Sequence, residues 1–120
     1  MKRIFLPWPY EGLWPNDRPH WRVKAKATKA YRFAVKCLVG RADPGLIRVT
    51  FCPKPFGPMP DKDNCIAAFK AGQDGIADAL GVNDRDLIVT HEFGDRCKDG
   101  AVIVDIMPET VAIEFRGVIS

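Results

Sequence analysis

The sequence predicts a single α+β domain in which two helices cover one mixed β-sheet. Its 120 residues suffice for one hydrophobic core but not for two. With 47% hydrophobic and 28% charged residues, the composition is that of a folded globular protein rather than a disordered one. Strand-like and helix-like segments follow one another in the order β-α-β-α-β-β, and residues 1–120 contain no internal repeat or linker that would divide the domain.

The first half of the chain predicts a strand, a loop, a helix and a second strand. Residues 3–7 are a short apolar strand, and residues 8–21 form an irregular loop that packs its aromatic side chains. Residues 23–39 predict an amphipathic helix with its basic residues outward, ended by Gly40. Residues 46–52 alternate partly and are β-branched, which favours a strand. The helix side chains whose spacing directs them towards the core are Ala30, Phe33 or Ala34, Cys37 and Leu38.

The second half predicts a loop, a helix and two or three strands. Residues 53–60 contain four prolines and predict a stiff, extended loop. A second helix is expected at about residues 64–80. Strands are expected at 87–93 and 101–107, joined by a polar turn, and residues 110–115 allow one more.

Several protein classes are excluded by what the chain lacks. No apolar run approaches the roughly 20 residues of a membrane span. The N-terminal segment begins like a secretion signal, but prolines interrupt it at once, which predicts a cytoplasmic protein. A zinc site on Cys97 with His91 or His20 would need ligand pairs that the sequence does not contain. Apolar neighbours indicate buried free thiols at all four cysteines, which are Cys37, Cys52, Cys65 and Cys97.

Positive charge is concentrated in one stretch, although the net charge is only +3. Between Arg18 and Arg41 the chain contains no Asp or Glu. A patch of one sign attracts polyanions, so a nucleic-acid backbone is the expected partner, and a solvated helix face is the alternative. The basic residues are Arg18, Arg22, Lys24, Lys26, Lys29, Arg32, Lys36 and Arg41.

Acidic residues gather before and along the second helix. Asp61 and Asp63 lie two positions apart in an extended approach, so their carboxylates point the same way and form a hard oxygen site suited to Mg²⁺ or Mn²⁺. Helical spacing places Asp63, Lys70 and Asp74 in one arc at the edge of the buried face, where a site is both rigid and reachable. The residues expected on the buried face itself are Ile66, Phe69, Gln73, Ile76 and Leu80.

A structural explanation of the same residues stays open. Asp61 would belong to a turn, and Asn64 or Asp63 would cap the helix. Lys70 with Asp74 would form an i,i+4 pair worth a few tenths of a kcal/mol. A second acidic cluster, Asp84 and Asp86 at a turn that leads into a strand, favours the functional explanation.

Taken in order, these blocks resemble the RusA family of Holliday-junction resolvases, especially its phage and prophage members. The resemblance covers nearly the whole chain and depends on the set rather than on any one motif. The matching blocks are Leu6-Pro7-Trp8-Pro9, then Asn16, Arg18 and His20-Trp21, then Ala30-Tyr31-Arg32, Asp61-x-Asp63-Asn64, Lys70, Asp74-Gly75 and Asp84.

The resemblance implies a homodimeric, Mg²⁺- or Mn²⁺-dependent endodeoxyribonuclease that resolves four-way DNA junctions by paired symmetric nicks in recombination and repair. It implies that Asp61, Asp63 and Asp84 bind the metal and that Lys70 is catalytic. Asp86 is the alternative to Asp84, because the family often carries two acidic residues at a turn that here begins with Asn83. The expected DNA-binding residues are Arg18, Arg22, Lys24, Lys26, Lys29 and Arg32.

Two alternatives to a junction resolvase remain. One is a catalytically altered protein that binds branched DNA, and the other is a nuclease that prefers flaps or forks. Exposed aromatic side chains could stack on unpaired bases in any of these, although packing in the core or in a dimer interface is the expected role. The aromatic residues concerned are Trp8, Tyr10, Trp21 and Phe56.

Overall fold

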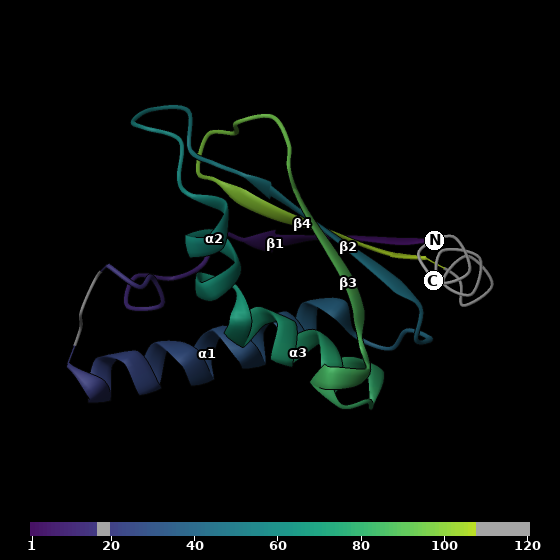
Figure 1. Ribbon diagram of the computed structural model, residues 1–120. Coiled ribbons are helices and arrows are strands. Elements are labelled where there is room, and N and C mark those ends of the chain that lie inside the picture. The colour runs from purple at the N-terminus through teal and green to yellow at the C-terminus, as the bar shows by residue number, and fades with distance from the viewer. Residues whose placement is uncertain (17–19, 108–120) are drawn as a thin grey trace.

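One mixed sheet and three helices on one of its faces make up the structure (Figure 1). The computed structural model describes residues 1–16 and 20–107. Arg18 and the strand considered at 110–115 lie outside the described residues. The α+β class, with one domain and a mixed sheet, is confirmed.

Strand β4 lies in the interior of the sheet, although it comes last among the described elements. The sheet order is β1-β4-β2-β3, with β4 antiparallel to both β1 and β2, and β3 parallel to β2. The polar connection after β3 therefore carries the chain past β2 instead of closing a hairpin. The strands are β1 (Lys2–Pro7), β2 (Leu46–Cys52), β3 (Ile88–Phe93) and β4 (Ala101–Met107).

The expectation of one helix at 64–80 is wrong, because the structure has two helices there. Helix α1 is Trp21–Val39, α2 is Lys62–Ala68 and α3 is Lys70–Leu80, and a 3-10 turn η1 follows at Asp84–Asp86. The break falls at Phe69, whose fully buried ring packs edge-on against Tyr31 and Phe51. This contact depends on the tertiary fold, so helical periodicity does not encode it.

The expected core face of α1 is also wrong. Tyr31, Val35 and Val39 are fully buried, whereas Phe33 is 66% exposed and Leu38 is 51% exposed. Two contacts explain why α1 turns this face, and not the expected one, towards the core. The Tyr31 hydroxyl donates a hydrogen bond to the Pro7 carbonyl at 2.6 Å, and Val35 packs where α3 passes closest.

The exposure of the cysteines departs in part from the expectation of buried thiols. All four are free, and Cys52 and Cys65 are buried. Cys37 is exposed on α1, and Cys97 is partly exposed. The prediction of a buried thiol is therefore confirmed for Cys52 and Cys65. It is wrong for Cys37 and holds only in part for Cys97.

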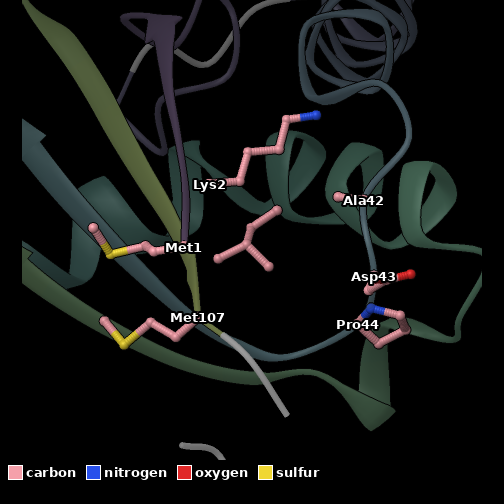
Figure 2. Close-up of a pocket in the computed structure, with 7 residues that line it drawn as sticks. Met1, Lys2, Ala42, Asp43, Pro44 and Met107 are labelled. Carbon is pink, nitrogen blue, oxygen red and sulfur yellow. The ribbon is translucent and has the colours of Figure 1, made fainter.

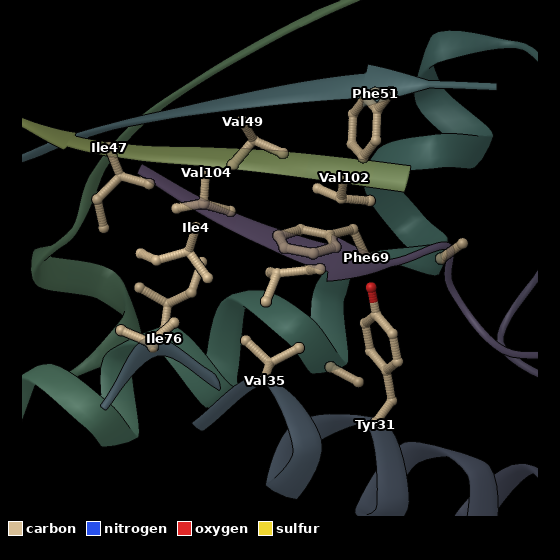
Figure 3. Close-up of a cluster of buried hydrophobic side chains, with 14 of the residues drawn as sticks. Ile4, Tyr31, Val35, Ile47, Val49, Phe51, Phe69, Ile76, Val102 and Val104 are labelled. Carbon is tan, nitrogen blue, oxygen red and sulfur yellow. The ribbon is translucent and has the colours of Figure 1, made fainter. Parts of the chain in front are cut away.

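The core lies between the sheet and the helices α1 and α3 (Figure 3). Val49 and Val104 from the sheet meet Ile76 of α3, which is fully buried. Gly75 lets α1 and α3 approach closely, since a Cβ atom at this position would lie 2.5 Å from the Arg32 carbonyl oxygen. The basic helix is thereby held firmly against α3.

The described part of the loop before α1 packs its aromatic rings, as expected. Trp8 and Trp14 stack with centroids 5.4 Å apart, and the Trp14 indole donates a hydrogen bond to the Pro9 carbonyl. Tyr10 packs edge-on against Tyr31 at 4.8 Å. None of the helices in the described part has the length and apolar character needed to cross a membrane.

Candidate active site

Asp61 and Asp63 both lie at the start of α2, but the expectation that they share an extended stretch and point the same way is wrong, because the helix already begins at Lys62 and includes Asp63. Asp61 is the N-cap, and its Oδ1 accepts a hydrogen bond from the Asp63 amide at 2.8 Å. Asp63 occupies the first turn, where the helix dipole favours negative charge. Both residues are exposed. The N-cap is therefore Asp61 and not Asn64 or Asp63 as expected, and capping uses one of the four carboxylate oxygens.

Lys70 connects the start of α3 to the turn before β3. Its Nζ donates to Asp74 Oδ1 at 3.1 Å and to Asp84 Oδ2. Gln73 Nε2 donates to the other oxygen of Asp84 at 3.2 Å. Both oxygens of the Asp84 carboxylate are thus bound to side chains of α3. Lys70 therefore bonds a residue beyond its own helix in addition to Asp74, its i,i+4 partner.

The electrostatics of this cluster favour two charged side chains at neutral pH. The hydrogen bond to Asp84 raises the pKa of Lys70, and Asp74 adds to that effect. The same bond from Lys70 lowers the pKa of Asp84, while partial burial opposes the shift. Lys70 is 57% exposed and Asp84 34% exposed, so the pair is open to a ligand.

The turn after α3 brings Asp84 against Lys70. Gly81 ends the helix in the left-handed conformation, and the chain then turns back beside α3. Asp84 opens η1 and its carbonyl accepts a hydrogen bond from the Leu87 amide at 3.1 Å. Asp86 is exposed at the other end of the same turn. Lys70 bonds to Asp84, the residue that the sequence resemblance preferred.

The expected DNA-binding residues that the structure describes all lie exposed on α1, and they are Arg22, Lys24, Lys26, Lys29 and Arg32. Arg32 differs from the others because its guanidinium is already bound. Its Nε and a terminal nitrogen bond the two oxygens of Asp78 on α3 at 2.6 and 2.9 Å. Asp84 and Asp74 raise the pKa of Arg32 further, and Asp78 is the main cause of that rise. Arg32 thus couples the basic helix to the Lys70 cluster.

The structure does not bring the three expected metal ligands together as a formed site. Within residues 1–16 and 20–107, no three His, Cys, Asp or Glu side chains are grouped so that they could hold an ion. Asp61 and Asp63 are neighbours, whereas Asp84 is bound to Lys70. The donor chemistry, three carboxylates, suits Mg²⁺ or Mn²⁺. An ion that used Asp84 would compete with Lys70 for it.

Two features of the structure were missed by sequence reasoning. Gln73 was expected in the core, yet it is half-buried and its amide supports Asp84. Its position three residues after Lys70, on the same side of a helix, was the available signal. The second feature is Asp105, which is 1% exposed and bonds both Arg3 and Arg48 on the sheet face opposite the helices. Only the sheet register, which aligns these three side chains across β1, β4 and β2, reveals it.

A hollow of about 590 Å³ lies away from these residues, at the start of β1 (Figure 2). Lys2 lies on its wall and donates to the Val39 and Arg41 carbonyls. The described residues that line it include no member of the predicted site; they are Met1, Lys2, Ala42, Asp43, Pro44, Ile106 and Met107.

Comparison with known proteins yields one informative relative. No family model matches the sequence. A protein of Xylella fastidiosa (strain Temecula1 / ATCC 700964), named only as an uncharacterized protein, is 37% identical over 117 residues. The match covers 88% of this chain and 76% of the relative.

Proposed function

This chain belongs to the same family as the Xylella fastidiosa protein, and we propose that it is a metal-dependent endonuclease that cleaves branched DNA. The observation that carries the proposal is the Lys70–Asp84 bond. It places a solvent-open ammonium group between two carboxylates, and Arg32 joins the basic helix to α3, the helix that carries Lys70. The resemblance to RusA resolvases supports the same assignment.

In this proposal each described side chain has a defined task. Asp61, Asp63 and Asp84 would hold Mg²⁺ or Mn²⁺, which when bound lowers the pKa of water and neutralises phosphate charge. Lys70 places its positive charge against the scissile phosphate, where negative charge builds in the transition state. Gln73 keeps the Asp84 carboxylate oriented.

The substrate and the assembly follow from charge and symmetry. Exposed lysines on α1 bind the phosphate backbone without reading its sequence, as structure-specific nucleases require. A four-way junction has a two-fold symmetric form, so a two-fold homodimer presents one site to each of two opposed strands. We propose that the dimer makes paired symmetric nicks during DNA recombination and repair, in the cytoplasm.

A cleavage assay with a matched pair of variants tests the proposal. Wild type, Asp84→Asn and Asp86→Asn would be incubated with a four-way junction, a flap and a linear duplex, each with Mg²⁺ and with EDTA. Wild type should nick the junction at symmetric positions only with Mg²⁺. Asp84→Asn should bind the junction without cutting it. Asp86→Asn should cut like wild type, because the residue that Lys70 bonds is Asp84. Normal cutting by Asp84→Asn would contradict the assignment of the site.

One observation favours a second candidate, a branched-DNA-binding protein without cleavage activity. Asp84 is bound by Lys70 and Gln73, and Asp61 caps α2, so both carboxylates already have partners. Tight junction binding without nicking by wild type, with either Mg²⁺ or Mn²⁺, would establish this candidate and exclude the nuclease. Faster cutting of the flap than of the junction would change the preferred substrate and keep the site.

A further inference from the structure

Trp21 is a large aromatic side chain left open to solvent at the start of α1. It is 68% exposed, although the Arg22 guanidinium lies over its ring at 5.2 Å. The other two tryptophans, Trp8 and Trp14, stack on each other instead. An exposed indole offers a flat apolar face on which a planar ring can stack.

A groove of about 470 Å³ runs from Trp21 along α1. The six described residues that line it all belong to α1, so it is an open groove on the surface of one helix. Ala25 and Thr28 form a low floor, and the Thr28 hydroxyl is satisfied by the Lys24 carbonyl at 2.8 Å. The floor is therefore effectively apolar and can accept a flat ring.

Beside this apolar floor, the groove is lined by positively charged side chains. Lys24, Lys29 and Arg32 line it, and the six described residues around it include no carboxylate. One flat apolar surface beside several cations matches a nucleotide, which has a flat base and an anionic phosphate. Base–aromatic stacking with basic flanks is the usual means of binding single-stranded nucleic acid.

The groove leads towards the proposed cleavage site. Arg32 lines its end and bonds Asp78 of α3, the helix that carries Lys70. Strand bound along Lys24, Lys29 and Arg32 would therefore approach the Lys70 cluster. In an intact duplex the bases are stacked on one another and are not available to an indole.

We propose that Trp21 stacks on an unpaired DNA base and that Lys24 and Lys29 hold the adjoining phosphates, so that the groove selects DNA with unpaired nucleotides. This inference rests on the proposed function and adds to it the feature of branched DNA that the protein recognises. The same helix offers a matched control, because Phe33 is 66% exposed and lies outside the groove.

The test measures binding in EDTA, so that cleavage plays no part. The probes are a labelled oligo-dT single strand and a fully paired duplex of equal length. The variants are Trp21→Leu, Trp21→Phe and Phe33→Leu, each checked for an unchanged circular dichroism melt. Trp21→Leu should weaken binding of oligo-dT by about 5- to 150-fold and leave duplex binding nearly unchanged. Trp21→Phe should lose less affinity for oligo-dT than Trp21→Leu, and Phe33→Leu should bind both probes like wild type.

The outcomes separate this inference from the proposed function. An equal loss for oligo-dT and duplex, no loss in Trp21→Leu, or the same loss in Phe33→Leu would overturn the stacking role. Selective loss in a protein that never nicks junction DNA would support the groove and refute only the nuclease. A wild type that does not bind oligo-dT would overturn the stacking role, whereas the proposed nuclease is refuted only by the junction cleavage assay.

Discussion

Replacing Gly75 by alanine tests whether α1 and α3 pack as closely as the structure indicates. The new Cβ atom would lie 2.5 Å from the Arg32 carbonyl oxygen and 3.0 Å from the Val35 Cβ. Ordinary van der Waals contact begins at 3.4 Å, so the helices would have to separate by about 0.9 Å. The closest obstacle is backbone, which a rotamer change cannot move aside.

The expected loss follows from two opposing effects. Overpacking of this kind costs about 1–3 kcal/mol, and alanine regains about 1 kcal/mol of helix propensity relative to glycine. Because the obstacle is a carbonyl and Val35 is fully buried, the net loss should be about 1–2 kcal/mol. For a domain of this size, that corresponds to a fall in Tm of about 4–8 °C.

Thermal and urea unfolding followed by circular dichroism would measure the change. The control is Ala30→Gly, at an exposed position of α1, which measures the helix propensity of the same pair of residues without a packing contact. It should lower stability by about 1 kcal/mol. A Gly75→Ala protein as stable as wild type, or more stable, would show that the two helices are farther apart and would refute this reasoning.

Three further predictions follow from single side chains. Lys70→Ala removes an exposed ion pair worth about 0.2–1 kcal/mol, so Tm should hardly change, while single-turnover cleavage should slow by about 10²–10³-fold. Cutting within a few-fold of wild type would remove Lys70 from the site. Burial lowers the pKa of His91, whose Nε2 has no hydrogen-bond partner in the described part of the chain. The unfolded chain then binds more protons below about pH 6.5, so urea stability should fall from pH 7 to 5. His91→Phe should flatten that fall, and an equal slope in both proteins would contradict it. Arg3 and Arg48 lower the pKa of Asp105, so its stabilising effect is present above about pH 3.9 and lost below it. Asp105→Asn should lower the urea midpoint at pH 7, and this difference should shrink as the pH falls below that value; a difference independent of pH would argue against an ionic role.

The sequence predicts the strands well and the packing of the helices poorly, for a physical reason. β2 lies at 46–52 as expected, because β-branched alternation is a local property. On α1, Ala30 with Cys37 and Tyr31 with Val35 both have helical spacing, so periodicity cannot choose between them. The choice is made by the Tyr31 bond to Pro7, a contact across 24 residues of chain.

In the candidate site, too, the sequence indicates some residues, whereas tertiary contacts determine how they are arranged. The resemblance to a family points to Lys70 and Asp84 as site residues, and the structure places their side chains in direct contact. The break at Phe69 puts Asp63 and Lys70 on separate helices, so the common arc expected from one helix does not exist. Asp105 could not be recognised, because its partners are defined only by the pairing of three strands.

The position of β4 also bears on the order in which this chain can fold. β4 supplies the antiparallel partner of both β1 and β2, and its pairing joins Lys2 to Ile106. During synthesis, β1 and β2 therefore lack the strand that joins them until Ala101–Met107 has left the ribosome. Contacts of such long sequence separation slow folding and expose strand edges meanwhile. The contact between α1 and α3 at Gly75 and the parallel pairing of β2 with β3 need no residue of β4, so both can form before the sheet is complete.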